Sequence, residues 1–156
     1  MSEILDSAIA KVSDAKCAFC RFITANDTGK NGSHQSGFYI PKCAAPLLFE
    51  TPGVKGENKD RFVEVKWQDS FTTESRFIYY GQGTRNEYRI TRFGKNFPFF
   101  EEDNVGDLLV IAQYNETYYY GYVLQSDQDI EDFFAYFNLS SETTNQLIDV
   151  KQAITQ

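Results

Sequence analysis

The residues between Arg85 and Lys95 are the part of this chain best suited to recognising another molecule. Arg85, Arg89, Arg92 and Lys95 stand against a single Glu87, which gives these eleven residues a net charge of +3 in a chain whose total is −7. Arginine binds guanine edges and phosphates through paired N–H donors, and glutamate can accept a hydrogen bond from cytosine. The segment therefore indicates a nucleic-acid reader. The alternative is a solvated edge strand with scattered charge.

A polar, glycine-rich loop from Asn26 to Gly37 is a second candidate. It carries Lys30, His34 and Gln35, and Tyr39 follows on a short strand. Glycine lets the backbone approach a ligand closely, and basic, amide and backbone N–H groups contact phosphates and base edges. This loop and the arginine segment could therefore grip a duplex from both sides. The alternative is a mobile surface loop.

The three cysteines raise the possibility of a zinc or redox site. Cys17 and Cys20 form a Cys-x-x-Cys pair, and with Cys43 and His34 they could supply four ligands. Alternation along a strand, however, points Cys17 and Cys20 to opposite faces. Buried, inert thiols are the preferred interpretation, and an odd number of cysteines favours a reducing cytosol.

Glu64-Val-Lys66 matches the carboxylate–x–lysine end of many metal-dependent nuclease sites, in which two carboxylates hold Mg²⁺. The partner carboxylate would be Asp60, four residues earlier. Alternation of these residues with valines and a tryptophan is typical of a plain amphipathic strand, which is the preferred interpretation. No nucleophile–base pair or phosphate-binding glycine loop accompanies them, so the chain alone is not expected to be an enzyme.

Charge is divided unevenly along the chain. Residues 1–100 hold 14 Lys/Arg and 11 Asp/Glu, whereas residues 101–156 hold one Lys and 11 Asp/Glu. The acidic C-terminal third would repel a polyanion, so a nucleic-acid surface is expected on the first two-thirds. The sequence shows neither an apolar run of the ~20 residues that span a bilayer nor a secretory signal. A cytoplasmic protein without a membrane partner is expected.

The hydrophobic pattern predicts short strands with helices at the edges. Helices are expected at 3–14, from 129 onward, and from Ser141, as the cap, to about 153, with one or two helical turns at 44–49. Strands are expected at 17–24, 38–41, 61–68, 76–80, 86–93, 108–114 and 118–124. This order indicates one mainly β domain with flanking helices over residues 1–156, folded as a closed or nearly closed barrel.

Several motifs along residues 19 to about 110 resemble the N-terminal effector domain of the EcoRII-type restriction endonucleases, a family that includes UbaLAI-like enzymes. They are Ala25-Asn-Asp-Thr-Gly29, His34-Gln35, Tyr39-Ile-Pro41, Ile78-Tyr-Tyr80, Thr84-Arg-Asn-Glu87 and Arg89-Ile-Thr-Arg92. The resemblance implies a DNA-binding pseudobarrel of about seven strands, like plant B-three transcription-factor domains. Such a domain grips the major groove with an N-arm and a C-arm, which correspond here to residues 21–39 and 83–95.

The resemblance also implies which residues contact DNA. The family positions carry over to Arg21, His34, Tyr39, Arg85, Glu87, Tyr88 and Arg89, to which the residues themselves add Lys30, Gln35, Asn86, Arg92 and Lys95. Arg85 and Arg89 are expected to bind guanine and Glu87 to accept from cytosine. Arg21, Lys30, Arg92 and Lys95 are expected to contact the DNA backbone. His34 and Tyr39 are expected to contact bases or phosphates.

Two departures from the family pattern bear on affinity. Family lysines before Thr84 and after Glu87 are replaced here by Gly83 and Tyr88. Fewer cations should weaken the phosphate contacts and flatten the salt dependence, or leave that role to Lys30 and Lys95. Preference for the family's CCWGG-like site is expected to be retained.

The expected function is sequence-specific binding of double-stranded DNA, in the N-terminal part of a longer bacterial type II restriction endonuclease with a separate C-terminal nuclease domain. No cofactor is expected for DNA binding, and Mg²⁺ is expected only in the catalytic domain. Two alternatives stay open. One is a small metal-dependent nuclease using Asp60, Glu64 and Lys66, and the other is an acidic protein-interaction barrel using the tyrosines of 118–122.

Overall fold

The computed structural model of the protein describes residues 2–28, 37–94 and 97–149. Its strands are β1 (Cys17–Phe22), β2 (Gly37–Ile40), β3 (Lys59–Trp67), β4 (Phe71–Tyr80), β5 (Glu87–Thr91), β6 (Leu108–Gln113), β7 (Tyr118–Leu124) and β8 (Gln146–Leu147). Its helices are α1 (Glu3–Ser13), α2 (Ala25–Thr28), α3 (Asp127–Phe137) and the 3-10 turns η1 (Lys42–Leu47), η2 (Glu102–Asn104) and η3 (Ser141–Thr143). The expected mainly β domain with flanking helices is confirmed.

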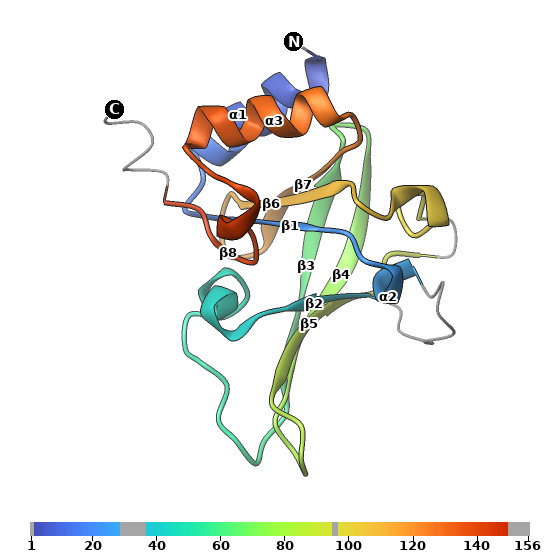
Figure 1. Ribbon diagram of the computed structural model, residues 1–156. Coiled ribbons are helices and arrows are strands. Elements are labelled where there is room, and N and C mark those ends of the chain that lie inside the picture. The colour runs from blue at the N-terminus through green and yellow to red at the C-terminus, as the bar shows by residue number, and fades with distance from the viewer. Residues whose placement is uncertain (1, 29–36, 95–96, 150–156) are drawn as a thin grey trace.

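The eight strands form one sheet in the order β2-β5-β4-β3-β7-β6-β1-β8. All neighbours are antiparallel except β3 and β7, which pair in parallel. The sheet curls strongly, so that β2 and β5 lie below β1 and β6 in Figure 1. Within the described ranges β2 and β8 are its two edges, so the expected closure of the barrel is incomplete, and the sheet has one more strand than the seven predicted.

An aromatic core fills the inside of the curl. The Trp67 ring packs against Phe97 with centroids 4.9 Å apart, and Phe77 meets Tyr119 edge to face at 4.9 Å. These rings come from strands and loops far apart in the sequence, so their contact holds the curl together. Burial of such large apolar surfaces is the main force stabilising the fold.

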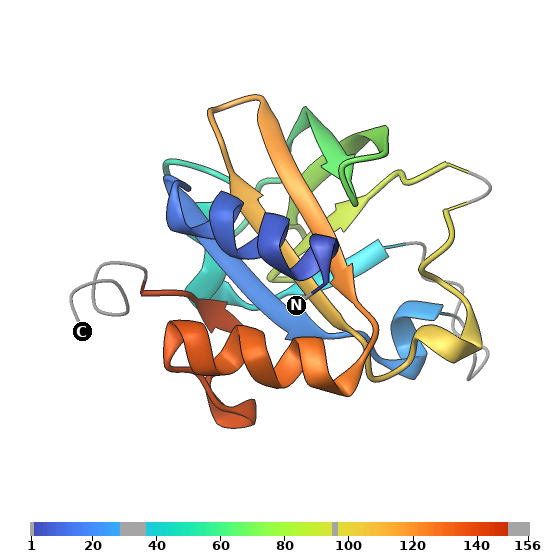
Figure 2. The same cartoon turned by 90° about the horizontal axis from the view of Figure 1, so that it is seen from above.

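A second core lies on the outside of the sheet, under the two long helices. Leu5 and Val12 of α1 and Phe133 of α3 pack on the outer residues of β1, β6 and β7, and Figure 2 shows both helices lying across these strands. β6 is therefore buried along its whole length. None of the helices in the described ranges has the length and apolar character needed to cross a bilayer.

Serine N-caps set the first residues of the two long helices. Ser2 and Ser126 accept hydrogen bonds from the backbone N–H groups of Leu5 and Asp129, which starts α1 and α3.

The predicted helix from Ser141 is wrong over the described residues. Ser140 is the cap there, only one 3-10 turn follows, and Asn145 at φ 67° turns the chain into β8.

α1 and α3 cover only the β1-β6-β7 part of the sheet, so neither of these two helices covers the outer face of β2, β5 and β4 (Figures 1 and 2). The acidic α3 lies at the opposite end of the molecule from the turn that joins β4 to β5 (Figure 1). The acidic η2, however, contacts α2. Within the acidic C-terminal third, α3 therefore lies far from the arginine segment, whereas η2 lies beside α2, where the N-arm begins.

Candidate nucleic-acid interface

The uncovered face is built by three neighbouring antiparallel strands. Tyr39 of β2 pairs with Arg89 of β5, and Tyr80 of β4 pairs with Glu87 of β5. Side chains alternate along a strand, so Glu87 and Arg89 lie on the outer face, with side chains 24% and 12% exposed, while Tyr88 and Ile90 are buried. The sheet thus brings residues from both expected arms onto one surface.

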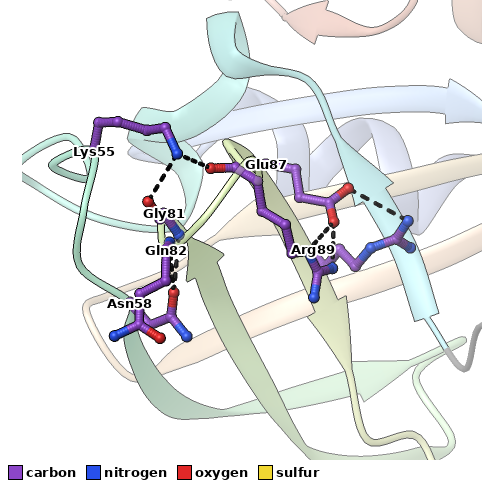
Figure 3. Close-up of polar contacts among 7 residues, drawn as sticks. Lys55, Asn58, Gly81, Gln82, Glu87 and Arg89 are labelled. Atoms are coloured by element: carbon purple, nitrogen blue, oxygen red, sulfur yellow. Dashed lines mark hydrogen bonds and ion pairs between the residues drawn. The ribbon is translucent and has the colours of Figure 1, made fainter.

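Glu87 sits between two arginines on this surface. Its Oε1 accepts a hydrogen bond of 2.9 Å from Nε of Arg85 and a second, shorter one from Nη2. Its Oε2 lies 3.6 Å from Nη2 of Arg89. Figure 3 shows the Glu87 carboxylate directed toward Arg89. One carboxylate therefore orients two guanidinium groups, each of which has five N–H donors and so keeps some for a ligand.

Two tyrosines extend this group sideways. The guanidinium of Arg85 lies 3.7 Å from the centre of the Tyr80 ring, and that of Arg89 lies 6.0 Å from the centre of the Tyr39 ring. A cation over an aromatic face is attracted by the ring quadrupole, which further restricts both arginines. Tyr39 is 42% exposed. We call Tyr39, Tyr80, Arg85, Glu87 and Arg89 the arginine–tyrosine row.

A hollow of about 480 Å³ lies between α2 and this face. Asp27 and Thr28 line one side, and Arg76 and Arg92 contribute to the other. Arg92 directly follows β5 and has a φ of 65°, and its guanidinium lies over Phe62 at 5.3 Å. The expected backbone-contacting position of Arg92 is therefore on the surface, at the end of β5 opposite Arg85.

Arg21 does not lie where a DNA-contacting cation is expected. Arg21 is 5% exposed, and its Nη1 donates a 2.9 Å hydrogen bond to Oδ2 of Asp27, which is also buried. The same oxygen accepts a 2.8 Å hydrogen bond from the backbone N–H of Thr24. The interaction fixes α2 where the N-arm begins. This placement contradicts the expected backbone contact, because a guanidinium inside a buried ion pair is closed to phosphate.

Tyr88 is likewise placed inside. It is 4% exposed, and its hydroxyl accepts a 2.7 Å hydrogen bond from the backbone N–H of Gly53. Its expected contact with DNA does not fit this position, and the alternation with Glu87 and Arg89 was the signal in the sequence that places it inward. Asn86 is exposed, and its Oδ1 accepts a 2.8 Å hydrogen bond from the Tyr79 hydroxyl.

The remaining predicted contacts lie outside the described residues: Lys30, His34, Gln35 and Lys95. The structure describes the residues that flank them, up to Thr28 and from Gly37 on one arm, and Gly94 and Phe97 on the other. Gly37, which follows the loop, pairs with Thr91, next to Arg92. The N-arm therefore rejoins the sheet beside the end of β5, while the turn that carries Arg85 stands at the start of β5.

Sequence reasoning missed a loop that contacts this turn. Nζ of Lys55 donates to the carbonyl oxygens of Gly81 and Arg85 at 3.1 and 2.8 Å. Asn58 accepts from the backbone N–H groups of Gly81 and Gln82. No motif in residues 54–58 indicates these contacts, because the partners are more than twenty residues away in the chain.

The residues of the nuclease alternative lie apart. Asp60 and Glu64 are on the exposed face of β3, four residues apart, which at ~3.3 Å per residue is too far for both to bind one metal ion. Oδ2 of Asp60 instead accepts a 2.6 Å hydrogen bond from Nε of Arg76. In the described part of the chain no three His, Cys, Asp or Glu side chains are grouped to hold a metal ion. The predicted amphipathic strand is confirmed.

The cysteines differ in exposure, which corrects the expectation that all are buried. Cys20 is buried, Cys17 is intermediate, and Cys43 is exposed, with its Sγ donating to the carbonyl oxygen of Asn145 at 3.2 Å. Burial raises the pKa of the Cys20 thiol to about 12. The same cause raises the pKa of the Cys17 thiol, with Lys16 opposing it.

This difference predicts selective labelling of the thiols. Because the thiolate is the reactive form, iodoacetamide at about pH 8 is expected to alkylate Cys43 first and to leave Cys20 unmodified in the folded protein. Mass spectrometry of proteolytic fragments after timed labelling measures both, and urea-unfolded protein, in which all three react, is the control. Equal labelling rates of Cys20 and Cys43 in the folded protein would contradict the buried position of Cys20.

Comparison with known proteins agrees with this architecture. The family model described as "Restriction endonuclease EcoRII, N-terminal" matches residues 12–145. The type II restriction enzyme EcoRII of Escherichia coli is 39% identical over an alignment of 101 residues, and the match covers 60% of this chain and 25% of that enzyme. The chain therefore spans about a quarter of the length of this curated relative.

A solved structure resembles the fold. The B3 domain of the UbaLAI restriction endonuclease, crystallised with its cognate DNA as a triple leucine-to-methionine mutant, matches with a TM-score of 0.52 and 20% identity. The match covers 86% of this chain and 88% of that one. The curled sheet with its flanking helices is thus a pseudobarrel of the B3 type, as predicted.

Proposed function

The chain belongs to the family of EcoRII N-terminal domains, and from this membership we propose that it binds double-stranded DNA sequence-specifically through the major groove. The observation that carries the proposal is the arginine–tyrosine row. Two guanidinium groups and a carboxylate are held by one another on a face that neither α1 nor α3 covers. These are the groups that read guanine and cytosine edges, and their fixed orientation reduces the entropy lost on binding.

The roles follow from the donors and acceptors. Arg85 and Arg89 donate to O6 and N7 of guanine, and Glu87 accepts from N4 of cytosine. Each arginine has donors beyond those that Glu87 uses, and a carboxylate accepts about four hydrogen bonds, so the row need not come apart when it binds. Tyr39 contacts bases or phosphates beside Arg89, and Arg92 contacts the DNA backbone.

The spacing of the arms suits a duplex. β5 separates the turn that carries Arg85 from the start of β2 at Gly37, and its five residues extend over roughly 15–17 Å. The major groove of B-DNA is about 12 Å wide. The turn that carries Arg85 and the start of β2 would therefore stand at the two sides of a groove, with Arg89 and Tyr39 between them. The family relation makes a CCWGG-like sequence the target.

The wider role follows from the length of the relative. Residues 1–156 form the DNA-recognition domain of a bacterial, cytoplasmic type II restriction endonuclease, whose cleavage is performed by a separate C-terminal domain. DNA binding by the recognition domain needs no cofactor, and Mg²⁺ acts only in the catalytic domain.

A gel-shift titration with CCWGG, permuted and methylated duplexes at about 50 and 200 mM salt tests the proposal. We expect the CCWGG duplex to bind most tightly and all complexes to weaken steeply with salt, because phosphate contacts release counterions. Equal affinity for CCWGG and permuted duplexes would contradict sequence-specific binding. The methylated duplex shows whether methylation blocks the site.

Plasmid incubated with the chain and Mg²⁺ separates this function from the nuclease alternative. We expect intact plasmid, since the residues of that alternative do not converge; cleavage that is lost in Glu64→Gln would support a nuclease instead. DNA affinity that is undetectable at both salt concentrations would favour the protein-interaction alternative.

A further inference from the structure

The turn that carries Arg85 is contacted by a second loop. We call residues 81–86, between β4 and β5, the C-arm turn, and residues 54–58, before β3, the brace loop. The backbone N–H of Gly56 donates a 2.7 Å hydrogen bond to the carbonyl oxygen of Gly81. Figure 3 shows Lys55 and Asn58 of the brace loop directed at Gly81 and Gln82. The two loops are thus joined through backbone and side-chain contacts.

Lys55 is the centre of these contacts. Its Nζ donates to three carbonyl oxygens of the C-arm turn, which are those of Gly81 at 3.1 Å, Gly83 at 2.5 Å and Arg85 at 2.8 Å. An ammonium group has three N–H donors and no acceptor. All three donors are therefore used inside the protein. Lys55 thus draws three carbonyl groups of the turn toward one point. It has no N–H donor left for a phosphate.

Asn58 holds the same turn from its N-terminal side. Its Oδ1 accepts hydrogen bonds from the backbone N–H groups of Gly81 at 2.9 Å and Gln82 at 3.2 Å. The two loops approach so closely that a Cβ added at Gly81 would lie 2.3 Å from the carbonyl oxygen of Glu57. Asn58 and Lys55 satisfy opposite polar groups of the turn, so together they restrain both its N–H and its C=O groups.

We propose that the brace loop is a specificity-determining element: Lys55 and Asn58 are positioning residues that place Arg85 for base reading and do not themselves touch DNA. The proposal rests on the proposed DNA-binding function. Arg85 lies at the end of the turn, and its own carbonyl is one of the Lys55 acceptors. Reading a base edge requires the guanidinium fork to arrive in one orientation, whereas binding a phosphate does not.

Two substitutions at position 55 separate a brace from a phosphate contact. Lys55→Met removes the donors and the charge, and Lys55→Arg keeps the charge but replaces the compact ammonium with a planar fork that cannot converge on the same three carbonyls. Lys11→Met, on α1 over Tyr120 and remote from the turn, removes one charge as a control. Asn58→Ala tests the second contact without changing charge.

The first measurement needs no DNA. Hydrogen exchange by NMR is expected to show the amides of Gly81 and Gln82 exchanging about tenfold faster in Asn58→Ala and Lys55→Met than in the wild type, because their hydrogen bonds are lost or loosened. Exchange in β6 should stay unchanged, which shows that the variants are folded. Unchanged exchange at Gly81 and Gln82 in both variants would overturn the brace.

The second measurement is the affinity ratio between CCWGG and permuted duplexes as salt is varied. Lys55→Met and Lys55→Arg are both expected to lower this ratio about tenfold, because hydrogen bonds from a charged donor are lost. In both variants the slope of log affinity against log salt is expected to equal that of the wild type. A ratio restored by Lys55→Arg, or a slope reduced by about one in Lys55→Met, would make Lys55 a phosphate contact and overturn the proposal. If the wild type itself shows no preference, the proposed function fails, while the exchange measurement still decides whether the brace exists.

Discussion

Replacing Arg21 with methionine lowers the free energy of unfolding by about 3–5 kcal/mol, because the carboxylate of Asp27 is left buried without its cation. The side chains of Arg21 and Asp27 are 6% and 4% exposed, so water does not replace the lost partner. Urea denaturation measures the change, with fluorescence of the single tryptophan, which is buried at Trp67, as the probe. A loss below about 1 kcal/mol would contradict a buried ion pair.

Two further variants identify the cause of this loss. Arg21→Met combined with Asp27→Asn is expected to recover most of the stability, because the asparagine oxygen still accepts from Thr24 N–H and no charge remains buried. Arg76→Met is the matched control, since it breaks the ion pair between Arg76 and Asp60. The side chains of these two residues are 32% and 39% exposed, respectively. We expect that control to change stability by about 0–1 kcal/mol.

Arg85→Ala weakens binding to the CCWGG duplex by about 1–3 kcal/mol and relaxes base preference at one position. The reason is the loss of paired donors to one guanine, together with the loss of a partner that orients Glu87. Competition gel shifts with duplexes substituted at each position of the site measure the effect. If the ratio between specific and permuted duplexes is unchanged, Arg85 does not read a base.

Arg85→Lys is the matched control because it keeps the charge but loses the planar fork. We expect it to bind permuted duplexes as the wild type does and to lose preference for the CCWGG duplex almost as Arg85→Ala does. Lys95→Ala, at a position outside the described residues, is expected to weaken binding to all sequences alike, as a phosphate contact does.

Much of this surface is readable from local patterns. Glu87 and Arg89 are two residues apart, and strand alternation alone predicts that they share a face. The same rule places Tyr88 inside, where the structure has it. The expected contact at Tyr88 came from family resemblance alone, and the packed hydroxyl bonded to Gly53 shows why the backbone pattern was the better guide.

Other features had no local signal. Arg21 was expected to contact the DNA backbone because the family resemblance places a DNA contact at this position, yet α2 turns Asp27 back onto it. The brace loop depends on partners 23 to 30 residues away, at Gly81 and Arg85. The predicted helix at Ser141 failed because Asn145 turns the chain to pair with β1, and an edge strand of two residues has no detectable period.

The sequence by itself determined the residue types of the arginine–tyrosine row, the inward and outward alternation of β5, and the mainly β character of the domain. These depend on backbone geometry within a few residues, which each segment carries with it. Only the tertiary structure decided which cations stay accessible, which face α1 and α3 leave open, and what holds the C-arm turn. Burial and pairing depend on groups that become neighbours when the sheet curls, and no segment of the chain contains that information alone.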